Sequence, residues 1–235
     1  MNDRAFTTTT GVGRRGPAFP FVPSTRIPDP DRRPLRIAAL VGSARRASLN
    51  HALLRAVVRV LPDDAIVEPV AIELLPFYDG DLEAADASAE VRAFRDAVSS
   101  ADALLVVTPE YNRSLPAVVK NAIDWASRPR SSAAIAGKPV LLLGATPGMG
   151  GVRHALDHAA AVLAFAGAVP FERRFGVANA AARLGDDGGL PDDQLLAELA
   201  EVVGEFVASV RQETLHGPVA GRREPVATRR WSSAA

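Results

Sequence analysis

The 235-residue sequence contains no cysteine. Disulfide bonds, thiolate metal sites and a cysteine nucleophile are therefore excluded, and the composition fits a reducing cytoplasm. Long apolar runs are also missing, since no stretch reaches the about 18 residues that a membrane-spanning helix needs. Residues 1–15 lack the apolar centre of a secretory signal. We therefore expect a cytoplasmic protein with no membrane partner.

A surplus of charge of one sign is absent too, because 27 Lys and Arg balance 27 Asp and Glu. The distribution is uneven: residues 1–34 hold six Arg and three Asp, and residues 216–235 hold four Arg and one Glu. Each end thus carries +3, and the segment between them carries −6. An acidic body offers no broad surface for nucleic acid, so no nucleic-acid partner is expected.

The two ends differ from the rest of the chain in pattern as well as in charge. Residues 1–34 contain several prolines and a threonine run, and neither end shows an apolar period. Segments of this kind do not bury enough apolar surface to fold. We predict a disordered tail containing Pro and Arg over 1–34, one compact domain over 35–215 and a flexible basic tail over 216–235.

Between the two ends, strand and helix patterns alternate. Each apolar run of strand character is followed by apolar residues at helical spacing, such as Leu53, Val57 and Leu61 after the first run. Five such units predict an α/β fold of the flavodoxin-like type: a three-layer sandwich whose five-stranded parallel sheet has the order 2-1-3-4-5, with helices on both faces. The predicted strands are residues 35–41, 65–72, 103–107, 140–143 and 169–177.

The loop over residues 42–50, directly after the first predicted strand, is rich in hydrogen-bond donors. A bound phosphate needs donors because its oxygens only accept. Ser43, Ser48 and Asn50 supply small neutral donors, and Arg45 supplies a charged fork. A helix that begins near Ser48 would add the positive end of its dipole. The loop has neither the Walker A pattern nor the dinucleotide glycine pattern, so a mononucleotide phosphate fits better. The alternative is that Ser48 only caps the helix and the arginines are solvated.

A second polar loop, residues 108–116, follows the third predicted strand. In the order 2-1-3-4-5 the first and third strands are neighbours at the switch point, so both loops would share one edge of the sheet. Pro109 restricts the backbone, Tyr111 can stack on a planar ring, and Asn112 can shape the turn or bond a ligand. Pro116 is suited to start the following helix. The alternative is an ordinary strand-to-helix loop that faces water.

A third loop, residues 145–151, follows the fourth predicted strand. Its three glycines allow a ligand to approach the backbone closely, and Thr146 can donate a hydrogen bond. The alternative is a helix entry in which the glycines serve only as turn residues.

Four motifs in the chain are specific in combination. They are Gly-Ser-x-Arg-x-x-Ser-x-Asn at 42–50, Leu-Pro-Phe-Tyr-Asp at 75–79, Pro-Glu-Tyr-Asn-x-Ser-x-Pro at 109–116 and Lys-Asn-Ala-Ile-Asp-Trp at 120–125. Together they resemble the NAD(P)H-dependent FMN reductases, a family that includes azoreductases, quinone reductases and chromate-reducing enzymes. The resemblance covers about residues 35–211, in the order found in the family.

The resemblance implies an enzyme that passes hydride from NADPH or NADH to bound FMN and then to an acceptor such as a quinone, free flavin, azo compound or metal oxyanion. It implies a homodimer or homotetramer with the flavin near the subunit interface, and it assigns no catalytic side chain and no metal. The residues implied for the FMN phosphate are Ser43, Arg45, Ser48, Leu49 and Asn50. Those implied for the flavin ring are Pro109, Glu110, Tyr111, Asn112, Thr146, Gly148 and Gly150.

Two other functions stay open at this point: an FMN-binding electron carrier that does not turn over NAD(P)H, and a non-catalytic flavodoxin-like interaction module. A metal site at His154 and His158, four residues apart on a predicted helix, is not expected because no third ligand is evident. Ser114 is not expected to be a hydrolase nucleophile, because the sequence shows neither an elbow motif nor a paired histidine. Lys120 and Asp124 are expected to form an ion pair on one helix face.

Overall fold

The computed structural model describes residues 33–43, 45, 48–84, 88–185 and 192–216. The predicted tails therefore lie outside the described residues, apart from residues 33–34 and 216. None of the described helices is long and apolar enough to cross a membrane.

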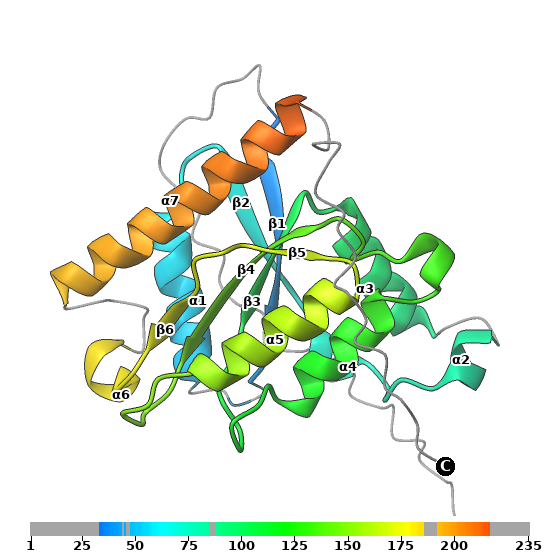
Figure 1. Cartoon of the computed structure of the whole chain (residues 1–235), viewed down its shortest axis with the longest axis horizontal. Coiled ribbons are helices and arrows are strands. Elements are labelled where there is room, and N and C mark those ends of the chain that lie inside the picture. Colours follow the sequence, from blue (N-terminus) through cyan, green and yellow to red (C-terminus); the bar gives the residue numbers. More distant parts are fainter. Residues whose placement is uncertain (1–32, 44, 46–47, 85–87, 186–191, 217–235) are drawn as a thin grey trace, which may run out of the picture.

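The described strands form one parallel sheet with the order β2-β1-β3-β4-β5, and β6 also pairs with β4 (Figure 1). The predicted order is thus confirmed, and β2 lies at the edge of the sheet, a position that tolerates its Pro69. The strands are β1 (Leu35–Val41), β2 (Ala65–Val70), β3 (Ala103–Val107), β4 (Pro139–Ala145), β5 (Val169–Pro170) and β6 (Phe175–Val177).

The prediction of one continuous strand over residues 169–177 is wrong. The chain leaves the sheet after Pro170, where the Phe171 N–H makes a last hydrogen bond to the Val140 carbonyl, at 2.8 Å. Arg173 then pairs with Glu201 and Glu205, and Arg174 pairs with Asp157, before the chain rejoins β4 as β6. The fifth position of the sheet is consequently filled by two short segments.

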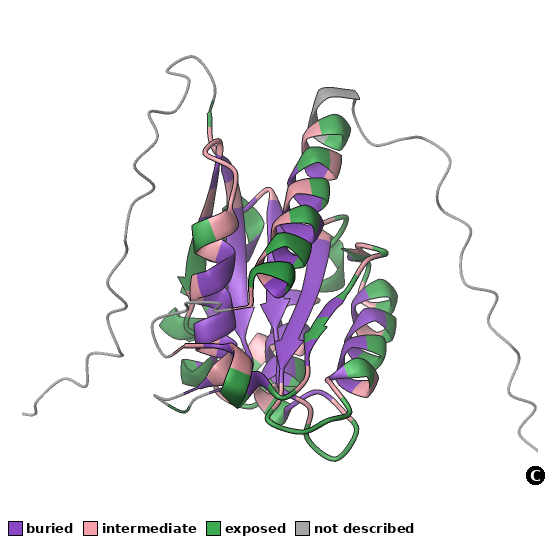
Figure 2. Cartoon of the chain, turned by 90° about the vertical axis from the view of Figure 1, so that its left-hand side faces the viewer, coloured by how far each residue is buried: buried purple, intermediate pink, exposed green. Residues whose placement is uncertain are grey.

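Helices cover both faces of the sheet, as predicted, and Figure 2 shows the buried strands between them. α1 and α7 pack on one face, and α3, α4 and α5 pack on the other. The long helices are α1 (Leu49–Val60), α3 (Ala89–Ser100), α4 (Ala117–Ala126), α5 (Arg153–Phe165) and α7 (Asp193–His216). Four short elements were not predicted: the 3₁₀ turns η1 (Ile72–Leu74) and η2 (Arg130–Ser132) and the helices α2 (Gly80–Ala84) and α6 (Ala180–Arg183).

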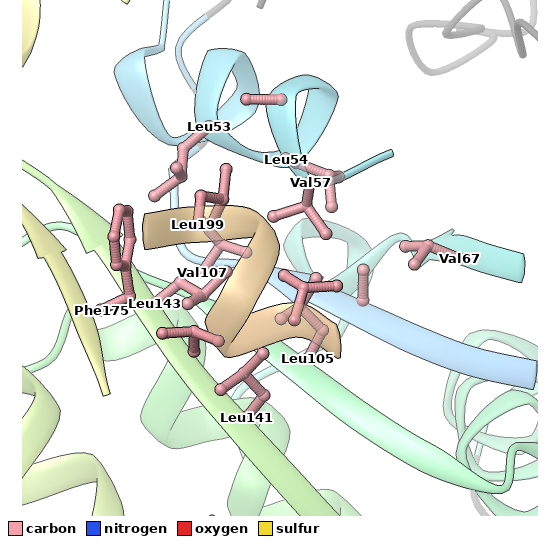
Figure 3. Packing of buried hydrophobic residues seen from close by; sticks show 14 of the residues in the cluster. Leu53, Leu54, Val57, Val67, Leu105, Val107, Leu141, Leu143, Phe175 and Leu199 are labelled. Atoms are coloured by element: carbon pink, nitrogen blue, oxygen red, sulfur yellow. The ribbon is translucent and has the colours of Figure 1, made fainter. Parts of the chain in front are cut away.

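β3 and β4 are buried on both faces, which explains why their sequences are apolar throughout. Along β3, Leu105 and Val107 point to the α1 and α7 side, where they pack near Leu199 (Figure 3). Leu104 and Val106 point to the side of α3, α4 and α5. Burial of each such side chain contributes about 1.5–3 kcal/mol. The two cores together hold the strand ends, and hence the loops, in fixed positions.

The motif over residues 120–125 holds a segment that is distant in sequence. The amide of Asn121 and the indole N–H of Trp125 both donate to the Pro76 carbonyl, at 2.9 and 2.8 Å. The Tyr78 N–H donates to Asn121 Oδ1 at 2.7 Å. Phe77 lies between these anchored residues and is nevertheless 80% exposed. The motif therefore fixes an apolar side chain on the surface.

Two glycines let β1 and β4 approach the end of β3 closely. A Cβ atom at Gly144 would overlap the Thr108 carbonyl oxygen and lie 2.7 Å from Val152 Cγ2. A Cβ atom at Gly42 would lie 2.5 Å from Val119 Cγ2 and 3.0 Å from Thr108 Oγ1. A larger residue at Gly144 would push against the backbone at the end of β3, and one at Gly42 would displace the Val119 side chain of α4.

We predict that Gly144→Ala destabilises the protein by about 1–3 kcal/mol, because the added methyl group meets backbone rather than a movable side chain. Chemical unfolding monitored by circular dichroism measures the change. Gly204→Ala is the matched control: Gly204 lies in α7 with nothing within 4 Å of an added Cβ. There alanine should stabilise the helix by about 0.5–1 kcal/mol. A Gly144→Ala protein as stable as the wild type would contradict the tight approach.

Candidate functional site

The loops that follow β1, β3 and β4 meet at one edge of the sheet, around the fully buried Thr108. Hydrogen bonds continue the ladder beyond the strands. The Gly42 N–H donates to the Val107 carbonyl at 2.8 Å, and the Thr108 N–H donates to the Leu143 carbonyl at 2.9 Å. The structure thus brings the three predicted loops together.

In the first loop, Ser43 and Ser48 are buried and Arg45 is exposed, while residues 44, 46 and 47 lie outside the described residues. Ser48 is the N-cap of α1, and its hydroxyl oxygen accepts a hydrogen bond from the Asn50 N–H at 3.2 Å. The cap proposed as the alternative function of Ser48 is therefore real. It uses a lone pair of the hydroxyl and leaves the O–H proton able to donate, so capping and anion binding are compatible.

A residue that sequence reasoning missed, His51, supports this loop from the first turn of α1. Its Nε2 lies 2.9 Å from the Ser43 carbonyl oxygen, which only accepts, so Nε2 carries a proton. Burial lowers the pKa of His51 below its ordinary value, although the bond to Ser43 opposes the shift. The neutral ring therefore holds the backbone of Ser43 in place. Its position three residues after a predicted helix cap was the available signal.

Asn50 joins the first loop to the third. Its side-chain amide donates to the Ala145 carbonyl at 3.0 Å, and its Oδ1 accepts from the Ala145 N–H at 2.9 Å. This buried pair of bonds braces the start of α1 against the end of β4. Asn50, which was predicted to contact a phosphate, thus has a bracing role. Leu49, also predicted for the site, is partly buried against the core formed with α1 and α7.

The second loop is a tight hairpin. The backbones of Tyr111 and Ser114 exchange two hydrogen bonds of 2.9 and 3.0 Å, and both residues between them, Asn112 and Arg113, have positive φ values of 51° and 60°. This geometry is that of a type I′ turn, in which asparagine is favoured. Pro109, which precedes the hairpin, is buried. Tyr111, by contrast, is 49% exposed, so the hairpin presents its ring at the edge of the sheet.

Two side chains dock this hairpin on α5. The Ala155 N–H, in the first turn of α5, donates to Glu110 Oε2 at 3.1 Å. Ser114 Oγ lies 2.8 Å from His158 Nδ1, so the expectation that Ser114 has no paired histidine is wrong. No local sequence pattern connects the two residues, because they are 44 positions apart in the chain. Both bonds fix the position of the hairpin relative to α5.

The third loop is anchored at its start and open further on. The carbonyl of Thr146 accepts from the Ala180 N–H at 2.9 Å, and its Oγ1 accepts from the Gly148 N–H at 3.3 Å. Beyond this anchor, Gly150 and Met149 are exposed. An added Cβ at Gly150 would meet nothing within 4 Å. This part of the loop therefore leaves space beside its backbone.

The chemistry of the site fits FMN. A cationic side chain, two buried hydroxyls and the amino end of α1 gather at the first loop, and the first turn of α1 has no acidic residue. That donor set suits a phosphate dianion. The hairpin and the third loop offer exposed backbone and one aromatic ring, which suit a planar heterocycle.

The predicted ion pair of Lys120 and Asp124 is confirmed, at 2.6 Å, and lies on α4.

We predict that His51 makes stability depend on pH in a defined direction. Because its pKa is lower in the folded protein than the ordinary 6.5, it stabilises the fold above about pH 6.5, and this contribution is lost as the pH falls toward the folded-state pKa. His51→Gln keeps an N–H donor but does not titrate. The stability advantage of the wild type over this variant, from urea unfolding, should shrink between about pH 7.5 and 5. An advantage that is constant or grows on acidification would contradict the assignment.

The chain matches the family of NADPH-dependent FMN reductases over residues 35–182. It is 35% identical over 178 residues to a quinone reductase of Pseudomonas putida, covering 74% of this chain and 94% of that protein. It is 44% identical over 131 residues to a 2-hydroxy-1,4-benzoquinone reductase of a Burkholderia species, covering 56% of this chain and 71% of that protein.

Solved structures agree in fold. The NAD(P)H:acceptor flavoenzyme FerB of Paracoccus denitrificans is similar with a TM-score of 0.69 at 33% identity, covering 76% of this chain and 98% of that one. An archaeal flavodoxin is similar with a TM-score of 0.51 at 12% identity, covering 75% and 99%, which shows the flavodoxin-like fold alone. The chain therefore belongs to the NADPH-dependent FMN reductase family and is an oxidoreductase that uses FMN with NAD(P)H.

Proposed function

We propose that this chain reduces quinones, with NAD(P)H as the hydride donor and with FMN held by the three loops around Thr108. The observation that carries the proposal is the meeting of a donor-rich loop with an aromatic hairpin and an open glycine turn at one sheet edge. Its quinone part is supported by the relatives from Pseudomonas putida and Burkholderia, both named for quinone reduction. Free flavins, azo compounds and metal oxyanions are the other acceptors we consider.

The FMN phosphate, in this proposal, lies at the first loop. Arg45 supplies the charge, while Ser43 and Ser48 supply hydroxyl donors next to the amino end of α1. Asn50 acts mainly by bracing the loop through Ala145, since both of its polar atoms already bond there. Leu49 contributes backbone rather than side chain.

The flavin ring, in this proposal, lies between the hairpin and the third loop. Pro109, Glu110 and Asn112 contribute backbone groups, because the Glu110 carboxylate is bonded to α5 and Asn112 forms the turn. Tyr111 offers the exposed aromatic contact. On the other side, Thr146, Gly148 and Gly150 line the space beside the third loop, where the open glycines permit close approach.

Bound FMN supplies the hydride chemistry, and the protein positions both substrates against it. The chain has to hold the flavin edges, keep one ring face accessible and offer N–H donors where negative charge develops. Hydride transfer itself needs no side-chain acid or base, and we assign none. An electron carrier would share the binding residues but would not need an open face for two substrates.

We further propose a homodimer or homotetramer in the cytoplasm. The exposed apolar side chains of Leu74, Phe77 and Leu82 follow β2, and such side chains commonly lie at subunit contacts. We also propose that residues 35–215 form the complete FMN-binding domain and that residues 1–34 and 216–235 are dispensable tails. The family match over residues 35–182 supports this division.

We predict that Arg45→Ala weakens binding of FMN by about 1.5–3 kcal/mol, because a charge-assisted contact to the phosphate is lost. Binding of riboflavin, which has no phosphate, should change little. Fluorescence quenching of each flavin by apoprotein measures both affinities. Arg130→Ala, in the exposed turn η2 after α4, is the matched control and should leave both unchanged. Equal losses of affinity for FMN and riboflavin would show that Arg45 does not contact the phosphate.

We predict that NAD(P)H and a quinone react in turn at the same ring face. Initial rates should give parallel lines in double-reciprocal plots, since the oxidised nicotinamide must leave before the quinone binds. Replacing Tyr111 by leucine should weaken flavin binding or slow the reaction without removing an ionisation from the pH profile, because no acid or base is assigned. Intersecting lines would mean that both substrates bind together, contrary to the single open face.

A further inference from the structure

Arg113 is an arginine at a backbone position that favours glycine. It is the second central residue of the type I′ turn, with φ of 60°, and its side chain is exposed. No carboxylate of the described residues forms an ion pair with it. Glycine would fit this turn better, so the side chain itself is the feature to explain.

The hairpin docking places the turn that carries Arg113 along α5, a helix that begins with a second exposed arginine. Glu110 bonds the Ala155 N–H, and Ser114 bonds His158, so the turn lies along the first two turns of α5. Arg153, the first residue of α5, is exposed and has no ion pair with any described carboxylate. Both arginines therefore flank the rim between the hairpin and α5.

The acidic groups near this rim are already engaged. The carboxylate of Glu110 accepts from the Ala155 N–H, and Asp157 pairs with Arg174. On the neighbouring α4, Asp124 is paired with Lys120. Glu110 keeps its negative charge, because its partner is a neutral backbone N–H, but the two unpaired arginines outweigh it and leave the rim positive. In a body whose net charge is −6, a cationic rim next to the ring loop points to an anionic ligand.

We propose that Arg113 and Arg153 bind the 2′-phosphate of NADPH and make NADPH the preferred donor. This inference rests on the proposed function, which brings the nicotinamide to the ring next to Tyr111. NADPH and NADH differ only by that phosphate, and a guanidinium binds phosphate through two parallel hydrogen bonds. Only one residue, Asn112, lies between Tyr111 and Arg113, so the rim lies beside the place where the dinucleotide enters.

Arg113→Gly tests this without disturbing the turn, because glycine accepts the positive φ. The ratio of kcat/KM for NADPH to kcat/KM for NADH should exceed one in the wild type and should fall about tenfold or more in Arg113→Gly, with a further fall when Arg153→Ala is added. Arg113→Lys should recover part of the ratio. Arg130→Ala, at the opposite edge of the sheet, should leave the ratio unchanged.

Calorimetric binding of 2′,5′-ADP and of 5′-AMP gives a second readout that does not depend on turnover. Only 2′,5′-ADP carries the 2′-phosphate, so its affinity should fall in Arg113→Gly and with added salt, while that of 5′-AMP should not. In the kinetic test, equal losses of kcat/KM for NADPH and NADH would place the arginines on the shared pyrophosphate and overturn the assignment. An unchanged ratio of the two kcat/KM values would overturn it as well.

A failure of the proposed 2′-phosphate site can be distinguished from a failure of the proposed reductase function. If neither dinucleotide reduces the flavin while 2′,5′-ADP still binds through Arg113, the phosphate site stands and the reductase proposal fails. If NADH and NADPH reduce the flavin equally well and 2′,5′-ADP does not bind, the reductase proposal stands and the phosphate site is wrong.

Discussion

The close approach of three strand ends around Thr108 is the constraint on which the site depends. Gly42 and Gly144 are the residues that allow it, because a Cβ at either would collide with Thr108 or its neighbours. Three loops of different character consequently share a small region at the carboxyl edge of the sheet. Asn50 then ties the first loop to the third through Ala145, and Glu110 ties the second to α5. The buried β3 and β4 residues keep this frame rigid.

The polar residues of the site have two kinds of role. Asn50, Glu110 and His51 hold the loops, because they bond backbone groups of other segments. Others keep the capacity to meet a ligand, among them Arg45 and the hydroxyl proton of Ser48. A flavin enzyme of this family needs both kinds, because its protein part positions a cofactor whose own ring carries the chemistry.

The sequence was sufficient for the sheet order and the loops, and insufficient for contacts that depend on packing. Fully apolar runs such as β3 predict buried parallel strands. Because the strands are parallel, the loops that follow them lie at one edge of the sheet. The contact of Ser114 with His158 spans 44 residues, and that of Asn50 with Ala145 spans 95, so no local pattern reveals either. The break between β5 and β6 coincides with ion pairs that Arg173 and Arg174 form with residues of α7 and α5, and these contacts are equally non-local.

The most direct test of the account is anaerobic reduction of the purified protein, followed by its absorption spectrum and by mass identification of the released cofactor. The account predicts that the protein carries FMN and that one equivalent of NADPH bleaches its absorbance. A stoichiometric addition of quinone should then restore the oxidised spectrum. A protein whose bound FMN stays oxidised in the presence of both NADPH and NADH would contradict the reductase and would leave an electron carrier in its place.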